Sequence, residues 1–134
     1  MAEYLKLVSG VLHRADKVLL GLRKNTQYYP GYWGLPGGRL ESGENFVDAL
    51  RRELFEEVGV QMIDGENITT LYDHELQIEH EVFSVIEWRG EPKNLEPELC
   101  EEIQWFSFDN LPEPITPASQ KIIDSLKREP AEDK

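Results

Sequence analysis

Alternating apolar and polar positions at the start of the chain predict a β-hairpin. Residues 4–13 alternate well enough for a strand, residues 14–17 have the composition of a tight turn, and residues 18–23 form a second alternating run. Residues 25–38 break the pattern with four glycines, two prolines and several aromatic residues. This composition interrupts regular structure, so we expect a functional loop there.

From Asn45 the pattern changes to a helical period. Apolar residues then recur along one stripe, at Val47, Leu50, Leu54 and Val58. Asn45 is a favourable N-cap, with Asp48 three residues later, and Gly59 is the kind of residue that ends a helix. The sequence therefore predicts a helix between Asn45 and Gly59.

Further strands are predicted downstream of this helix. Strand-like runs cover residues 68–78, 82–88 and 103–108, with a charged turn between the first two and a polar connection over residues 89–99. Thr116 followed by Pro117 is a good helix start, and the residues from Glu129 form a polar tail. Nothing repeats and no linker divides the chain, so we expect one domain over residues 1–134.

Composition narrows the class of protein. The chain has 134 residues and a formal net charge of −12, which disfavours binding to long nucleic acids. Hydrophobic residues make up 40%, too many for a disordered chain, and no apolar run approaches the roughly 20 residues that a bilayer requires. The single Cys100 excludes an internal disulfide, and the first residues lack a secretory signal. We expect a folded cytoplasmic protein without a membrane partner.

The charge is uneven along the chain. Residues 1–37 carry five bases and two acids, whereas residues 38–113 carry twenty acids and five bases. Within this acidic part, Glu53, Glu56 and Glu57 share an arc of about 100° on the predicted helix. Like charges three and four residues apart repel one another and destabilise a helix unless a cation neutralises them. Carboxylate oxygens are better ligands for Mg²⁺ or Mn²⁺ than for zinc.

The residues around these glutamates follow a longer pattern. Gly38 is followed after five residues by Glu44 and after seven more by Arg52, and the sequence from there is Arg-Glu-Leu-Phe-Glu-Glu-Val-Gly-Val. Residues 38–60 thereby resemble the Nudix box, with all nine specified positions matched. The entry Leu-Pro-Gly-Gly before it and the order of elements resemble a Nudix hydrolase domain over nearly the whole chain.

This resemblance implies an α+β fold, the Nudix-type α/β/α sandwich with a mixed β-sheet. It also implies Mg²⁺-dependent hydrolysis of a nucleoside diphosphate linked to another group, with Mn²⁺ as a possible substitute. The implied metal ligands are the Gly37 or Gly38 carbonyl and the carboxylates of Glu53, Glu56 and Glu57.

Catalytic roles follow from the same resemblance. Glu53 is the first choice as general base, Glu57 is a further catalytic carboxylate, and Arg52 orients Glu53 or the phosphates. Glu98, Glu101 or Glu102 is the alternative to Glu53, as a carboxylate that a distant loop brings to the metal. The competing interpretation is that each is a solvated charge in a loop. Glu44 is either a ligand or a brace for the metal-site loop.

Substrate contacts are predicted from the basic N-terminal part. Arg23 is a candidate for phosphate binding, with an exposed strand-end arginine as the competing interpretation. Tyr28 or Tyr29 offers a face for stacking a base.

The substrate class is chosen by elimination. Family members that act on ADP-ribose or on diadenosine polyphosphates commonly carry a proline or a tyrosine about 16 residues after the box, and residues 75–77 are Glu-Leu-Gln. We therefore expect a MutT-like enzyme that cleaves a nucleoside triphosphate to a monophosphate and pyrophosphate. The alternatives are a nucleoside diphosphate sugar or ADP-ribose as substrate, and a non-catalytic nucleotide-binding regulatory module. The chain is expected to be a monomer or homodimer.

Overall fold

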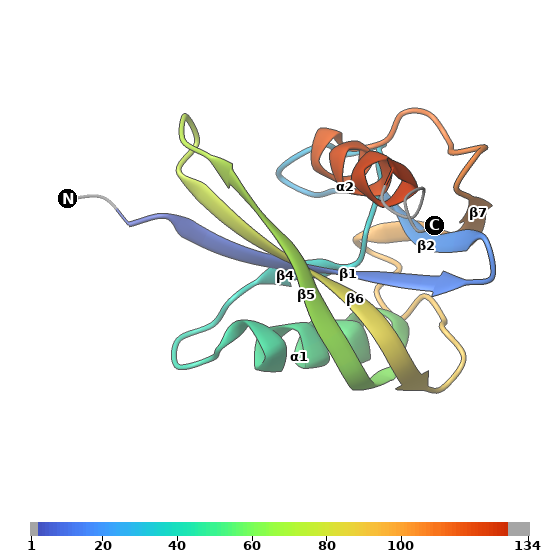
Figure 1. Ribbon diagram of the computed structural model, residues 1–134, viewed down its shortest axis with the longest axis horizontal. Helices are drawn as coiled ribbons and strands as arrows, with labels where there is room; N and C mark the ends of the chain where they lie inside the picture. The colour runs from blue at the N-terminus through green and yellow to red at the C-terminus, as the bar shows by residue number, and fades with distance from the viewer. Residues whose placement is uncertain (1–2, 129–134) are drawn as a thin grey trace. The chain divides into compact units, whose positions relative to one another are not determined.

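The computed structural model describes residues 3–128 and contains a mixed β-sheet and two helices. The elements follow one another along the chain as shown in Figure 1. They are β1 (Leu5–Arg14), β2 (Lys17–Arg23), β3 (Trp33–Gly34), β4 (Gly37–Arg39), α1 (Phe46–Val58), β5 (Gln61–Asp73), β6 (Ile78–Arg89), β7 (Cys100–Ser107) and α2 (Pro117–Arg128). Among the described residues, no helix is long and apolar enough to cross a membrane.

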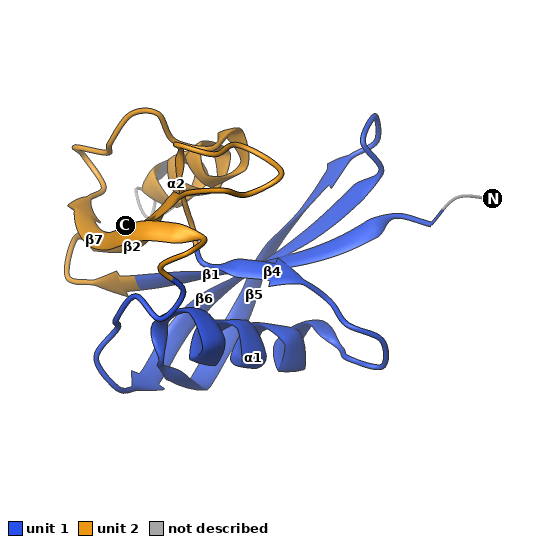
Figure 2. Cartoon of the chain, turned by 180° about the vertical axis from the view of Figure 1, so that it is seen from behind, with its two compact units in different colours: residues 1–12, 36–96 blue, residues 13–35, 97–134 orange. Residues whose placement is uncertain are grey.

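The contacts divide the chain into two compact units (Figure 2). Unit 1 comprises residues 1–12 and 36–96, and unit 2 comprises residues 13–35 and 97–134. Each unit therefore consists of two separate stretches of sequence. β1 crosses from one unit to the other, since it begins in unit 1 and ends in unit 2. The prediction of a single domain over residues 1–134 stays a prediction.

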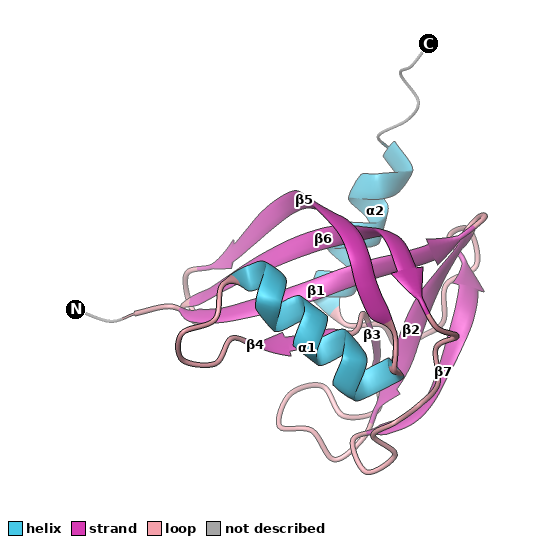
Figure 3. Cartoon of the chain, turned by 90° about the horizontal axis from the view of Figure 1, so that it is seen from below, coloured by secondary structure: helices cyan, strands magenta, loops and turns pink. Residues whose placement is uncertain are grey.

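Unit 1 holds the mixed part of the sheet. β1 pairs in parallel with β6 and antiparallel with β4, and β5 pairs antiparallel with β6. Figure 3 shows α1 lying along β1 and β4. The predicted apolar stripe of α1 faces inward, with Leu50 and Leu54 fully buried. Burial of leucine side chains contributes roughly 1.5–3 kcal/mol each, so this stripe fixes which face of α1 stays accessible.

Unit 2 holds antiparallel strands and α2. The end of β1 forms the predicted hairpin with β2, and β2 also pairs with β3 and β7. α2 begins at Pro117 as predicted, and its Ile122 and Ile123 are buried. The Thr116 hydroxyl accepts a hydrogen bond from the Ser119 backbone N–H at 3.3 Å, so Thr116 caps this helix.

The ends of several strands differ from the prediction. Residues 25–38 are not wholly a loop, because β3 pairs with β2 and β4 begins at Gly37. β5 begins at Gln61 and not at residue 68, and the turn before β6 covers residues 74–77, so that Glu79–Glu81 belong to a strand. β7 begins three residues before the predicted start. The predicted tail from Glu129 lies outside the described residues.

The ends of α1 agree with the prediction. The Asn45 side chain accepts a hydrogen bond from the Asp48 N–H at 2.8 Å, and Gly59 ends the helix with φ +72°. Both caps satisfy backbone groups that the helix itself leaves unpaired.

Replacing Asn45 by Ala should lower the free energy of unfolding by about 1 kcal/mol, because the Asp48 N–H loses its acceptor. Asn45→Asp keeps an acceptor oxygen and is the matched control. Urea unfolding of the three proteins measures the difference. Equal stability of the Ala and Asp variants would show that the cap contributes nothing.

Candidate active site

Arg52 on α1 is the centre of an ion-pair network in unit 1. Its Nε and Nη2 donate to the two carboxylate oxygens of Glu44 at 2.7 and 3.0 Å. Its Nη1 donates to Glu53 at 3.0 Å and to Glu56 at 3.3 Å, and Nη2 also reaches the Arg39 carbonyl at 3.1 Å. These carboxylates raise the pKa of Arg52 above its usual value. One permanent cation therefore hydrogen-bonds to three carboxylates and lies 3.6 Å from a fourth, that of Glu41.

Glu44 reaches Arg52 from the loop that precedes α1. Its backbone N–H donates to the Glu41 carbonyl at 3.0 Å, and its side chain accepts from the Glu41 N–H at 2.9 Å. Hydrogen bonds from Arg52 and then from the Glu41 backbone lower the pKa of the Glu44 carboxyl. Because both Glu44 oxygens bind Arg52, the contacts favour the brace over the ligand among its two predicted roles.

The pKa of the Glu57 carboxyl is shifted in the opposite direction from that of Glu44. Its Oε1 accepts a hydrogen bond from the Gly37 N–H at 3.3 Å, but no arginine contact to it is found among the described ion pairs. Desolvation raises the pKa of Glu57 well above its usual range, and Glu53 raises it further through a hydrogen bond and charge repulsion. Glu53 and Glu57 therefore resist carrying two negative charges at once.

Two glycines on β4 allow the backbone to approach these carboxylates. Gly38 lies opposite Val8 of β1, and a methyl group on Gly38 would overlap the Glu53 carboxylate. A methyl group on Gly37 would overlap the Val8 carbonyl. Gly37 cannot be replaced without moving the β1 backbone, whereas a side chain at Gly38 would displace the Glu53 carboxylate from its position beside β4.

The chemistry of this donor set fits a divalent cation. Within residues 3–128 no three His, Cys, Asp or Glu side chains are arranged to hold a metal ion in this conformation, since Glu53 and Glu56 bind Arg52 and Glu57 binds Gly37. The crowded carboxylates nevertheless leave negative charge that a hard cation would neutralise, and all available donors are oxygens. The predicted ligands lie on α1 and β4, and their role stays a prediction.

The structure adds Glu96, which the sequence analysis did not select. Residues 90–96 return to the end of α1, where the Lys93 and Leu95 N–H groups donate to the Val58 and Glu57 carbonyls at 3.0 and 2.9 Å. The charge of Glu96 makes a small contribution to the raised pKa of Glu57, so Glu96 acts on Glu57 electrostatically. Only the acidic composition of residues 96–102 pointed to this region, and it does not single out Glu96.

The remaining candidates belong to unit 2. Glu98, Glu101 and Glu102 are exposed. Arg23 donates through Nε and Nη2 to the Tyr28 carbonyl at 3.0 and 2.8 Å, so it fastens the loop that carries the tyrosines. The side chains of Tyr28 and Tyr29 are 52% and 45% exposed. Their predicted contacts with substrate stay predictions.

Comparison with known proteins gives consistent matches. A family model described as NUDIX domain matches residues 4–126. Oxidized purine nucleoside triphosphate hydrolase from Danio rerio is 34% identical over 110 residues, covering 80% of this chain and 69% of the relative. 8-oxo-dGTP diphosphatase from Buchnera aphidicola is 25% identical over 126 residues, covering 90% and 97%.

Solved structures share the fold. The crystal structure of a MutT NUDIX hydrolase from Burkholderia pseudomallei matches with a TM-score of 0.85 at 27% identity, covering 92% of this chain and 98% of that chain. This match and the mixed sheet with two helices confirm the predicted fold class.

Replacing Glu57 by Gln should stabilise the metal-free protein, because the neutral amide removes the repulsion with Glu53 and keeps an acceptor for the Gly37 N–H. We expect a gain of about 1–4 kcal/mol, the range for two like charges a few ångströms apart between bulk water and a protein surface. Thermal unfolding with and without Mg²⁺ or Mn²⁺ measures this. The parent chain should be stabilised by the metal and the variant should not.

Glu44→Gln is the matched control, since Glu44 is paired with Arg52. It should destabilise the metal-free protein. A Glu57→Gln protein that is less stable than its parent without metal would contradict the assignment of Glu57 as an uncompensated charge.

Proposed function

The chain belongs to the Nudix hydrolase family, and from this premise we propose that it is a pyrophosphohydrolase that converts a nucleoside triphosphate to a monophosphate and pyrophosphate. The observation that carries the proposal is the pair of mutually repelling carboxylates, Glu53 and Glu57, set against the glycine backbone of β4. Such a pair suits binding of a cation together with an anionic substrate.

The reaction is a displacement at phosphorus. Water forms a bond to one phosphorus of the α–β anhydride, and the bridging oxygen leaves with the other. The substrate carries several negative charges, which the acidic face of α1 would repel in the absence of counterions. Magnesium ions, which would be held by Glu53, Glu56, Glu57 and the Gly37 or Gly38 carbonyl, supply charge neutralisation and acidify water when bound.

Each protein group has a separate task in this proposal. Glu53 accepts the proton of the attacking water, since its carboxylate is positioned by the hydrogen bond from Arg52 at 3.0 Å. Arg52 holds Glu53 and Glu56 in place. Glu44 holds Arg52 in turn through two hydrogen bonds. Arg23 and one of Tyr28 and Tyr29 are the proposed contacts for phosphate and base.

The triphosphate is preferred over other substrates because the two curated relatives described above are named for nucleoside triphosphates or their oxidised forms. A nucleoside diphosphate sugar and ADP-ribose are the alternatives within the same chemistry. Cys100 is the single cysteine of the chain and so forms no internal disulfide, which is compatible with a reducing cytoplasm, the proposed location. The proposed assembly is a monomer or homodimer.

A panel of substrates tests the activity. Triphosphates, oxidised purine triphosphates, ADP-ribose and a nucleotide sugar are incubated with Mg²⁺ or Mn²⁺, and the products are separated by ion-exchange chromatography. We expect pyrophosphate and monophosphate from a triphosphate. Glu53→Gln should lower kcat by about 10²–10⁴-fold, the range for loss of a general base.

Products other than pyrophosphate and a monophosphate would contradict the proposed reaction. Release of inorganic phosphate from a triphosphate contradicts cleavage at the α–β anhydride, and turnover confined to ADP-ribose or a sugar nucleotide contradicts the substrate class. Nucleotide binding without any turnover would identify a regulatory module.

Glu96 has its own test. Glu96→Gln should raise the Mg²⁺ concentration needed for half-maximal activity by about 10-fold, because Glu96 adds negative charge beside Glu57. Glu66→Gln is the matched control, since Glu66 is exposed on β5 and is not among the candidate site residues. Equal metal dependence of both variants would remove Glu96 from the site.

A further inference from the structure

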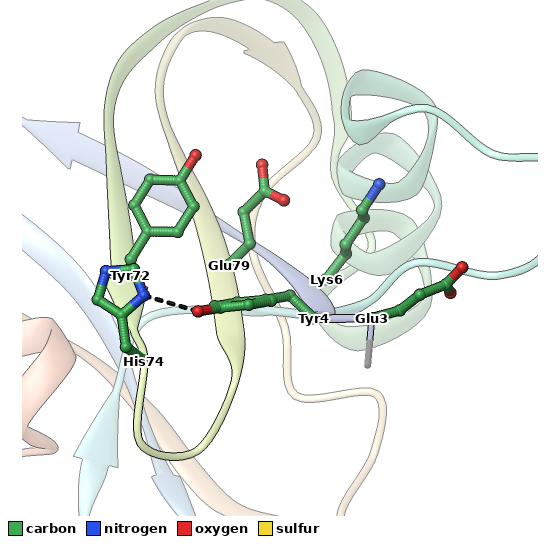
Figure 4. Close-up of a pocket in the computed structure, with 6 residues that line it drawn as sticks. All are labelled: Glu3, Tyr4, Lys6, Tyr72, His74 and Glu79. Carbon is green, nitrogen blue, oxygen red and sulfur yellow. Dashed lines mark hydrogen bonds between the residues drawn. The ribbon is translucent and has the colours of Figure 1, made fainter. Parts of the chain in front are cut away.

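A hollow of about 360 Å³ lies in unit 1 at the tip of the β5–β6 hairpin (Figure 4). Its volume is within the range of roughly 300–1,000 Å³ that is usual for small-ligand sites. The hollow lies on the same face of the sheet as α1, because alternate residues of β1 share a face and Gly10 packs against Leu50. Its lining consists of Glu3, Tyr4, Lys6, Tyr72, His74 and Glu79.

Three rings form a right-angled corner in this hollow, which we call the aromatic corner: Tyr4, Tyr72 and His74. The rings of Tyr72 and His74 are parallel, 4° apart in orientation, with centroids separated by 5.7 Å. The Tyr4 ring stands at 81° to Tyr72 and at 79° to His74. The Tyr4 hydroxyl and His74 Nδ1 are hydrogen-bonded at 2.6 Å on the exposed surface.

The aromatic corner is accessible to a ligand, because the Tyr72 side chain is largely exposed. In Figure 4 the Tyr4 ring is seen edge-on, and the side chains of Tyr72, Glu79 and Lys6 rise on one side of it. The Tyr72 side chain is 56% exposed. A group of a few atoms placed on the Tyr4 face would therefore contact a second ring and a carboxylate.

The charges around the corner favour a cation. Residues 72–81 contain four acids, Asp73, Glu75, Glu79 and Glu81, and no lysine or arginine. Glu3 and Glu79 both line the hollow, against one basic residue, Lys6. Aromatic faces carry partial negative charge and attract cations, and a nearby carboxylate adds Coulomb attraction. A phosphate in the same place would meet two carboxylates.

We infer that the aromatic corner is a second binding site, which takes an alkylammonium group on the Tyr4 and Tyr72 rings against the Glu79 carboxylate. None of its residues belongs to the carboxylate network of Arg52, so this site does not depend on the proposed hydrolase activity. The ammonium group can belong to a small molecule or to a lysine side chain, and the experiment separates these sources.

The test is an NMR titration of the 134-residue chain, labelled on its tyrosine and histidine rings. The probes are choline, its neutral carbon isostere 3,3-dimethylbutan-1-ol, Nα-acetyl-lysine amide and adenosine monophosphate. We expect choline or the lysine derivative to shift the Tyr4, Tyr72 and His74 signals at lower concentration than the isostere or the nucleotide. The tighter of the two cations identifies the source.

Four variants define the chemistry of binding. Tyr4→Leu should weaken the cation about fivefold, while Tyr4→Phe, which keeps the ring, should bind within about twofold of the parent. Glu79→Gln should weaken it about threefold, an effect that added salt reduces. Lys6→Gln should tighten it about twofold, because a repelling charge is removed.

The sign of the Lys6 effect decides between a cation site and an anion site. Weaker binding after Lys6→Gln, or tighter binding of the nucleotide than of choline, would overturn the inference. Equal affinity for choline and its neutral isostere would also overturn it, because charge would then contribute nothing. A Tyr4→Leu chain that fails to fold leaves the Tyr4→Phe, Glu79→Gln and Lys6→Gln comparisons as the decisive set.

Discussion

The candidate active site depends on the ion pairs between the Arg52 guanidinium and the surrounding carboxylates. Carboxylates gathered on one helix face repel one another, and a helix with such a face loses stability with each added pair. Arg52 lies on the same helix and donates to Glu44, Glu53 and Glu56. Its planar fork of donors suits several carboxylates at fixed angles, which a lysine ammonium would not provide. The acidic face is thus compatible with a folded α1 before any ligand arrives.

The candidate active site also depends on the backbone of β4, which lies close to α1. α1 can bring its carboxylates against β4 only if β4 has no side chains in the way, and both Gly37 and Gly38 are positions where a methyl group would overlap a neighbour. Pairing of β4 with β1 fixes the position of these glycines relative to Val8. The conformational freedom that two adjacent glycines would bring is therefore removed by strand pairing.

Local signals in the sequence predict the helix well and the strand ends poorly. Asn45 and Gly59 cap α1 through contacts within a few residues, so their chemistry alone identifies the ends. β3 and β4 exist because partners far along the chain, β2 and β1, offer hydrogen bonds to a glycine-rich segment. Glu96 shares this difficulty, since the backbone bonds of residues 93 and 95 with the end of α1 bring it to Glu57. No local pattern encodes such a return of the chain.

The four box glutamates look equivalent in sequence, yet the structure separates them by how each charge is compensated. Glu44 has both oxygens on Arg52 and a lowered pKa, which marks a group that stabilises the fold as an anion. Glu57 is desolvated beside Glu53 and Glu96 and has a raised pKa, so its anionic form costs stability in the metal-free protein. A cation that binds Glu57 recovers this cost as binding free energy, because binding to the folded state alone shifts the folding equilibrium. The proposed metal-dependent activity therefore gives a function to a carboxylate whose anionic form is unfavourable for stability.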